Sequence, residues 1–342
     1  MNQTAAGPEG RASGWQRARP WLIGAAVAVL LIAVLASAWW VLRERSRNQS
    51  QGVPGPSQAV PAQLQVKEDQ AREALGQLRF KLDSNAAGQR VATAPPQLDD
   101  ESLAKAAPYL AALSVSQLSL SNTQVTSLDA LKELTGLQTL YLSKTGVTSL
   151  DALKGLTGLQ TLHFAGDRVT SVDALKGLTR LQALNLSDTQ VTNLDALKGL
   201  TGLQTLYLAG TPVASVDALK GLTGLQQLDL SGTQVTSVDP LNGLTNLKTL
   251  DLSGTRVTSV DALKGLTGLQ VLNLSGTLVT SVDALKGLTG LQTLNLSGTR
   301  VTNVDALEGL TGLQKLYLPG TSVTSESLTR LQKALPKTTI TR

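Results

Sequence analysis

Hydrophobic and polar positions recur with a fixed period of 22 residues through the last two thirds of the chain. A period of this length is typical of a solenoid, whose units are each too small to bury their own apolar face and stack on their neighbours. The pattern predicts one repeat array over residues 115–324. Its units begin at Leu137, Leu159, Leu181, Leu203, Leu225, Leu247, Leu269, Leu291 and Leu313.

Alternating leucines within each unit predict a short strand. Leu140 and Leu142 point to one face of this strand, whereas Thr139 and Tyr141 point to the other. We expect the strands of successive units to pair in parallel and form one long sheet. Apolar residues from every unit then fill a continuous core, which in one unit comprises Leu137, Leu140, Leu142, Val147, Leu150, Leu153 and Leu156.

Two polar files accompany this core. A threonine such as Thr145, replaced by Asp167 in one unit, follows each strand, where its oxygen can bond the backbone of the turn and of the next unit. An aspartate then precedes Ala-Leu or Pro-Leu, which indicates the N-cap of a short helical turn, with a lysine three residues later in most units. Calcium sites gather several oxygen ligands within a few residues, and this unit does not. The aspartates are Asp129, Asp151, Asp173, Asp195, Asp217, Asp239, Asp261, Asp283 and Asp305.

The unit L-x-x-L-x-L-x-x-T-x-V-T-x-V-D-A-L-K-G-L-T-G resembles the 22-residue leucine-rich repeat of the internalin and SDS22-like class, and Thr233 to Leu247 matches it most closely. The resemblance covers residues 115–342. It implies an α/β solenoid, curved and right-handed, with parallel strands on the concave side, short 3₁₀ turns on the convex side and a role in protein recognition. The chain departs from the class by having threonine where asparagine is usual at the turn.

Short helices are predicted at both ends of the array, where the first and last units would otherwise expose apolar edges. Residues 99–114 form the expected N-terminal cap, with Asp100 or Ser102 as the N-cap residue of its helix. Residues 325–342 form the expected C-terminal cap, in which a helix is followed by a strand-like segment at Thr338 to Ile340.

An uncharged run of 22 residues, Trp21 to Leu42, follows a short N-terminal tail of residues 1–20. At about 1.5 Å per residue a helix of this length reaches roughly 33 Å, enough to cross a hydrocarbon core of about 30 Å. The run therefore predicts a single transmembrane helix at residues 21–42, with the lipid bilayer as its partner. All four tryptophans lie at or near its ends, as is typical of bilayer interfaces: Trp15, Trp21, Trp39 and Trp40.

A cleaved signal peptide is the alternative interpretation, because Ala36-Ser37-Ala38 has the small-x-small form of a cleavage site. The apolar run continues past that site to Leu42, which favours an uncleaved anchor. Three arginines lie close to the run on each side, so the positive-inside rule does not decide the orientation. We expect the tail inside the cytoplasm and the repeats in the periplasm or outside, on a single-pass protein of a bacterial inner membrane.

Two linkers and a stalk are predicted between the membrane segment and the array. Residues 43–63 and 83–98 are polar and rich in proline and glycine. Residues 64–82 are predicted as an amphipathic stalk helix with one apolar stripe, which either docks on another surface or forms a short coiled coil that makes a weak dimer. We expect the docked helix, because two heptads are few. The stripe consists of Ala71, Leu75, Leu78 and Leu82.

Composition argues against several kinds of chemistry. The chain has no cysteine, which excludes disulfides, thiolate metal sites and a cysteine nucleophile, and the lack of cystine-rich caps favours a bacterial source. With 16% charged residues, a net charge of +5 and no basic stripe, we expect no nucleic-acid partner. His163 is the only histidine, and no activated serine is marked near it. We therefore expect no enzymatic activity, metal or cofactor.

The candidate site is the central outward position of successive strands, where the residue type varies most. Interfaces draw much of their binding energy from aromatic anchors. The sequence therefore predicts a protein-binding surface of three ring-bearing residues, one asparagine and two acidic neighbours, with neutral drift on an unused face as the alternative. These residues are Tyr141, His163, Asn185, Tyr207, Asp229 and Asp251.

The expected function is that of a membrane-anchored scaffold, which binds or adheres to a protein partner through its concave face. One alternative is a structural spacer of the cell envelope, whose uniform surface binds nothing tightly. Another is a regulatory subunit of a separate enzyme chain.

Overall fold

The computed structural model of the chain describes residues 62–166 and 168–342. Nearly all of them form one compact unit, and the turn at residues 85–88 falls outside it. The tail, the transmembrane segment and most of the first linker, predicted for residues 1–20, 21–42 and 43–63, lie outside the described residues. None of the helices in the described part combines the length and the apolar character that a bilayer span requires.

Helix α2 (Ala62–Gln77) is shorter than the stalk helix predicted over residues 64–82. It ends because Arg79 adopts a left-handed conformation with a φ of 61°. The Phe80 N–H then donates to the Leu75 carbonyl at 2.9 Å, which closes the end of the helix.

Strands β1 (Lys81–Ser84) and β2 (Arg90–Thr93) lie where the stalk end and the second linker were predicted. The two strands pair antiparallel, and β2 also pairs in parallel with the first repeat strand. The linker prediction for residues 83–98 is therefore wrong over β2. Its four residues, Arg-Val-Ala-Thr, pair with β1 on one side and with the first repeat strand on the other, contacts that local composition does not reveal.

Helix α2 packs on the array through its apolar stripe. Ala71 and Leu75 are buried in the same core as the repeats. Arg90 of β2 donates to Glu68 of α2 at 2.8 Å and to the Leu113 carbonyl at 2.7 Å. The stripe thus faces the chain's own core, as in the docked alternative, and it offers no support for the predicted dimer.

Helix α3 (Asp100–Ala112) covers the first unit and buries Leu103, Ala106 and Leu110. Its N-cap residue is Asp99, one position before the predicted candidates, because the Asp99 side chain accepts the Ser102 N–H at 2.8 Å. Asp100 instead accepts the backbone N–H groups of Thr126 and Ser127 at 2.8 and 3.0 Å, which fastens the cap to the array.

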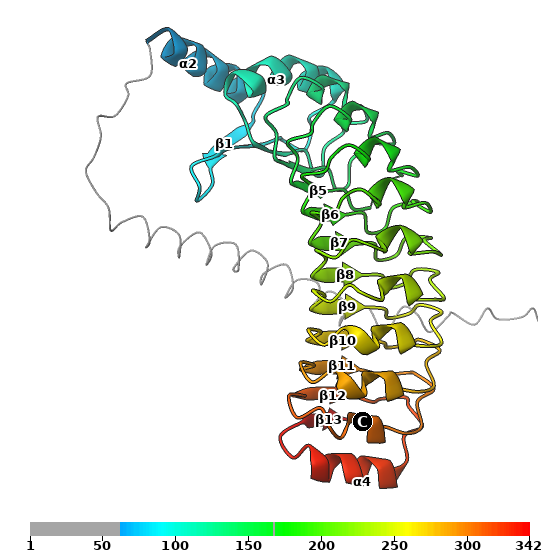
Figure 1. Cartoon of the computed structure of the whole chain (residues 1–342). Helices are drawn as coiled ribbons and strands as arrows, with labels where there is room; N and C mark the ends of the chain where they lie inside the picture. Colours follow the sequence, from blue (N-terminus) through cyan, green and yellow to red (C-terminus); the bar gives the residue numbers. More distant parts are fainter. Residues whose placement is uncertain (1–61, 167) are drawn as a thin grey trace, which may run out of the picture. The chain divides into compact units, whose positions relative to one another are not determined.

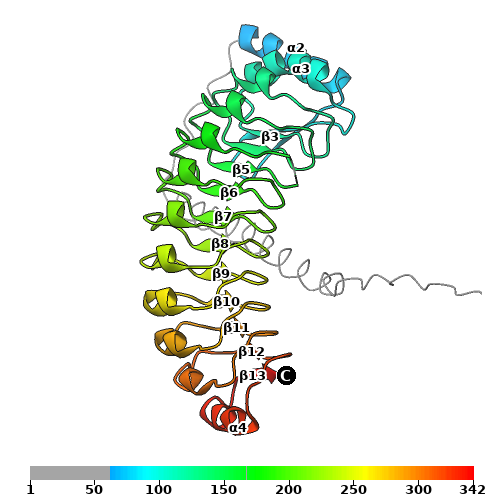
Figure 2. The ribbon, with the colours of Figure 1, turned by 90° about the vertical axis from the view of Figure 1, so that its right-hand side faces the viewer.

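The repeats form a curved solenoid with one 13-stranded sheet, in which strands β2 to β13 pair in parallel in chain order (Figure 1, Figure 2). Figure 1 shows the strands along the concave side of the array and the short helices along the convex side. The repeat strands are β3 (Gln117–Ser119), β4 (Thr139–Tyr141), β5 (Thr161–His163), β6 (Ala183–Asn185), β7 (Thr205–Tyr207), β8 (Gln227–Asp229), β9 (Thr249–Asp251), β10 (Val271–Asn273), β11 (Thr293–Asn295) and β12 (Lys315–Tyr317).

A 3₁₀ helix follows each strand from β3 to β11 on the convex side. Their bounds are η2 (Asp129–Leu131), η3 (Asp151–Leu153), η4 (Asp173–Leu175), η5 (Asp195–Leu197), η6 (Asp217–Leu219), η7 (Asp239–Leu241), η8 (Asp261–Gly265), η9 (Asp283–Gly287) and η10 (Asp305–Leu307). The core lies between the two layers, and its leucines and valines are almost fully buried. Each such side chain contributes roughly 1.5–3 kcal/mol before the entropy of ordering is subtracted.

The threonine file bonds the backbone within its own unit. Thr277, for example, donates through Oγ1 to the Leu274 carbonyl at 2.6 Å. This buried contact recurs at Thr123, Thr189, Thr211, Thr233, Thr255 and Thr299. The internal half of the predicted role is thus present.

The aspartate file does not cap the 3₁₀ helices as predicted. Each aspartate is the first helical residue, and no side-chain hydrogen bond is made by the N-cap residue before it. Instead the aspartate N–H donates to the side chain two residues earlier, as Asp261 does to Ser259 at 3.1 Å. A serine or asparagine in that place therefore closes the turn, and the carboxylate stays free to pair with lysine, as Asp151 does with Lys154 at 2.8 Å.

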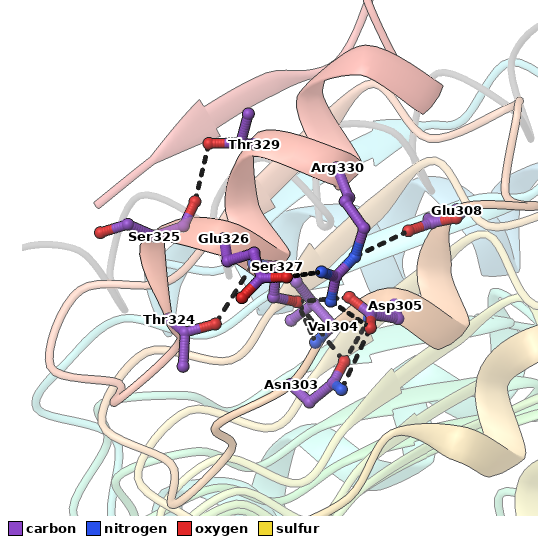
Figure 3. A network of polar contacts seen from close by, with 10 residues as sticks. All are labelled: Asn303, Val304, Asp305, Glu308, Thr324, Ser325, Glu326, Ser327, Thr329 and Arg330. Carbon is purple, nitrogen blue, oxygen red and sulfur yellow. Dashed lines mark hydrogen bonds and ion pairs between the residues drawn. The ribbon is translucent and has the colours of Figure 1, made fainter.

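Helix α4 (Ser325–Ala334) and strand β13 (Thr339–Thr341) close the C-terminal end. Figure 3 shows how polar side chains fasten α4 to the last unit. Ser327 is buried and donates through Oγ to Asp305 at 2.6 Å, while Arg330 bonds Asp305 and, at 2.8 Å, Glu326 (Figure 3). The hydrogen bonds from Ser327 and Arg330 lower the pKa of Asp305, so this carboxylate stays charged in the contact.

Candidate functional site

The candidate residues all occupy the last position of their strands, where the side chain points away from the core. We name these side chains, one per strand from β3 to β12, the central file. Parallel register sets each one beside the next, so Tyr141 pairs with His163 and Asp229 with Asp251. The structure thus brings the six predicted residues together along β4 to β9. The file consists of Ser119, Tyr141, His163, Asn185, Tyr207, Asp229, Asp251, Asn273, Asn295 and Tyr317.

Two rings form the N-terminal end of the candidate surface. The ring centroids of Tyr141 and His163 lie 5.0 Å apart, with an angle of 41° between the ring planes, within the range of favourable ring contacts. Burial raises the pKa of Tyr141 and lowers the pKa of His163, so both side chains are neutral near pH 7. An apolar side chain of a partner can therefore cover these rings without desolvating a charge.

Asn185 and Tyr207 continue the file towards the C-terminal end. Asn185 accepts the Ser187 N–H through Oδ1 at 2.9 Å, which fixes the amide group at the end of β6. The Tyr207 hydroxyl donates to Gln227 Oε1 at 2.7 Å. Burial, followed by the charge of Asp229, raises the pKa of Tyr207 to about 12. Tyr207 is thus a neutral, anchored ring beside the acidic residues.

Asp229 and Asp251 form the acidic end. Each accepts the backbone N–H of the serine two residues later at 2.8 Å. Asp251 is further held by Ser253 Oγ at 2.6 Å and by Asn273 Nδ2 at 3.0 Å. Burial and the neighbouring charge of Asp251 raise the pKa of Asp229 to about 6. Sequence reasoning marked both residues as outward-facing but missed this burial and the mutual repulsion.

The turn after the strands contains a further feature that sequence reasoning missed. Lys144 and Asp188 have left-handed φ angles of 60° and 59°, and the same place is glycine in every unit from Gly210 onward. The Lys144 N–H still donates to the Ala165 carbonyl of the next unit at 3.2 Å, as glycine does elsewhere. The signal in the sequence was the recurring Ser-Gly-Thr, which marks a position that requires positive φ.

The described residues include no group of three or more His, Asp or Glu side chains that could hold a metal ion. His163 contacts the Tyr141 ring, and no hydrogen bond or ion pair joins it to a carboxylate within residues 62–166 and 168–342. The central file thus has rings at one end and carboxylates at the other.

A family model for leucine-rich repeats, built on two copies of the repeat, matches half of the sequence. Its matches cover residues 114–155, 135–177, 179–221, 201–243, 223–265 and 245–287. The chain belongs to the leucine-rich repeat family. The predicted resemblance to internalin-like leucine-rich repeats is confirmed. No curated protein matches this leucine-rich repeat chain.

Solved structures of similar fold include three proteins of Listeria monocytogenes, two of them internalins. Internalin InlF is 20% identical with a TM-score of 0.63, over 80% of this chain and 94% of that chain. Internalin C2 is 28% identical with a TM-score of 0.54, over 71% and 100%. The functional domain of InlJ, described as including a cysteine ladder, is 22% identical with a TM-score of 0.56, over 69% and 59%. This leucine-rich repeat chain has no cysteine.

Proposed function

We propose that the chain is a membrane-anchored scaffold that binds a protein partner through the concave face of its repeats. The leucine-rich repeats indicate a protein–protein interaction scaffold. One observation carries the proposal further: the central file varies between aromatic, polar and charged residues, whereas the core beneath it stays apolar, with Phe164 replacing a leucine in one unit. This variation sets Tyr141, His163 and Tyr207 in one line with Asp229 and Asp251, and clustered aromatic side chains are typical of binding hot spots.

Membrane anchoring is the second part of the proposal. Its support is the uncharged run Trp21 to Leu42, with tryptophans at or near both ends, at a length sufficient to cross a bilayer. An anchor at this end would leave the cap and the array free to meet a partner beside the membrane. We propose a single span with the repeats outside the cytoplasm.

Photo-crosslinking of the full chain in cells that produce it tests both parts. A photoreactive residue replaces Asn185 in the central file or, as a matched control, Lys176, an exposed residue of the convex side. We expect a protein adduct from position 185 only, reduced about tenfold when Tyr141→Ala and Tyr207→Ala remove the anchors. The adduct should stay in the membrane pellet after an alkaline wash.

Several outcomes would contradict the proposal. Equal adducts from positions 185 and 176, or an adduct that survives the tyrosine changes, would remove the concave-face site. An adduct in the washed-off fraction would contradict the proposed membrane anchor but not the concave-face site. Circular dichroism of the double variant checks that the repeats remain folded, which we expect because both side chains point away from the core.

A further inference from the structure

The central file has two chemically different ends. Tyr141 and His163 present neutral rings in contact at β4 and β5. Asp229 and Asp251 lie side by side at β8 and β9. Tyr207 lies directly beside Asp229 in the register, so an aromatic ring borders the acidic end as well.

The acidic end has no cation of its own. No ion pair reaches Asp188, Asp229 or Asp251 within the part of the chain that the structure describes, whereas on the convex side Asp129 and Asp195 pair with lysines at 2.8 and 2.7 Å. The two central-file carboxylates repel each other, and Asp188 adds to the repulsion at Asp229. A cation supplied from outside would relieve this repulsion.

The hydrogen bonds of the two aspartates leave room for such a cation. Asp229 is held among the described residues by Ser231, whose backbone N–H donates to Oδ1 at 2.8 Å and whose side chain also hydrogen-bonds the carboxylate. Asp251 uses Oδ1 for Ser253 and Oδ2 for Asn273. A planar guanidinium can bridge two neighbouring carboxylates and lie against a tyrosine ring, which an ammonium group does less well.

We propose that the partner of the concave face is an extended protein segment with an apolar or aromatic side chain over Tyr141 and His163 and an arginine between Asp229 and Asp251. This inference rests on the proposed function and specifies the partner of the same surface. The segment runs across the strands, along the central file.

Strand geometry sets the spacing of the two anchors. Four strand spacings separate the ring pair from the carboxylate pair, about 19 Å at roughly 4.8 Å per strand, which an extended segment covers in roughly five or six residues. Asn185 and Tyr207 lie between the two ends, where an amide and a hydroxyl meet the backbone of the segment.

Peptide selection against the full-length chain tests the inference. A phage-displayed library of random peptides is selected on the unchanged chain, on the double variant Asp229→Asn and Asp251→Asn, and on the double variant Asp261→Asn and Asp283→Asn. The last is a matched control, because it removes the same charge from exposed turns of the convex side. Asparagine keeps the oxygen that accepts the serine N–H, so the strand ends should keep their structure.

We expect peptides with an arginine roughly five or six residues from an apolar or aromatic residue, selected by the unchanged chain and the control but not by the central-file variant. A selected peptide, resynthesised, should bind the central-file variant about tenfold more weakly, and replacing its arginine by citrulline should cause the same loss. Three outcomes would overturn the inference. The selected peptides could lack basic residues, basic peptides could bind the central-file variant equally well, or no peptide could be selected at all.

A third double variant, Tyr141→Ala with Tyr207→Ala, separates this inference from the proposed function. Peptides that need the tyrosines but not the aspartates would leave the concave-face site in place and remove the arginine. Peptides that bind without the tyrosine pair and without the aspartate pair would contradict both the concave-face site and the arginine.

Discussion

The units that carry β4 to β7 and those that carry β8 to β12 bury the same core and expose different surfaces. Leu206 in the first region and Leu272 in the second are fully buried. On the outward side the first region presents two tyrosines, one histidine and one asparagine, whereas the second presents two aspartates, two asparagines and one tyrosine. The second region also follows its strands with an almost constant Ser-Gly-Thr. Each core side chain packs between its equivalents in neighbouring units, so the core must stay apolar. The outward positions have no such constraint.

The turns after the strands differ in the same way. In the first region Gly166 and Gly210 occupy this place after β5 and β7, as glycine does in every turn of the second region, whereas Lys144 and Asp188 hold left-handed conformations after β4 and β6. Such a residue costs about 1 kcal/mol or more relative to an unstrained one, and strain of this kind tends to persist at functional sites. The first region combines this strain with its ring-bearing residues, which indicates that its surface, rather than its fold, distinguishes it.

The largest expected effect tests whether the two cores are equivalent. Leu206→Ala and Leu272→Ala each remove a fully buried side chain from the middle of a strand. We expect each to lower the free energy of unfolding by about 2–5 kcal/mol, because both leave a cavity between neighbouring units. Urea unfolding followed by circular dichroism measures the loss. A large loss at one position and a small one at the other would show that the regions differ inside as well as outside.

The next effect concerns the acidic end, at the border of the two regions. Asp229 has its pKa raised from 3.8 to about 6 in the folded chain, so its contribution to stability is present below the unfolded pKa and lost as the pH rises through 6. Asp229→Asn removes this pH-dependent loss of stability, because asparagine carries no charge at any of these pH values. At about pH 7.5 we expect the variant to be more stable by about 1–3 kcal/mol, with the difference vanishing near pH 4.

Unfolding of both chains at the two pH values measures this effect. Asp261→Asn is the control, because Asp261 is exposed on the convex side and makes only local hydrogen bonds. A variant that is less stable than the unchanged chain at the higher pH would show that the Asp229 charge is compensated in the fold, and it would weaken the case for an external cation.

The solenoid was predictable because its information is repeated along the chain. Nearly every unit carries the same leucines, and alternation alone distinguishes Leu140 from Tyr141. The short strand β2 was not predictable, since its pairing with β1 and with β3 makes Arg90 to Thr93 a strand. The true cap of the 3₁₀ helices was missed because serine two residues before the aspartate gives a weaker signal than the aspartate itself.

The candidate surface was predictable as a line of residues but not as an electrostatic unit. Strand alternation and repeat spacing bring Tyr141 and His163 into register, and the ring contact follows from that. The raised pKa of Asp229 depends on burial and on two neighbouring carboxylates, which are properties of the packed sheet. The strain at Lys144 was hidden because a lysine in a turn is ordinary until the φ angle is known.

The smallest expected effect tests whether the left-handed turn at Lys144 lowers the stability of the first region. Lys144→Gly should relieve a left-handed cost of about 1–2 kcal/mol, of which the greater freedom of glycine in the unfolded chain cancels about 0.5–1 kcal/mol. We expect a net gain of about 0.5 kcal/mol in the free energy of unfolding. The same change at Lys176, whose φ is −52° and which takes part in no ion pair among the described residues, is the matched control and should destabilise the chain, because glycine gains nothing there.

A gain in the free energy of unfolding at Lys144 and a loss at the control lysine would show that Lys144 destabilises the fold. Photo-crosslinking from position 185 then distinguishes the reasons for its retention. A weaker adduct in the Lys144→Gly variant would place this side chain within the partner surface beside Tyr141, and an unchanged adduct would restrict the surface to the central file. A loss of stability at both lysines would instead show that the turn carries no strain, and the contrast between the two regions would then rest on their outward side chains alone.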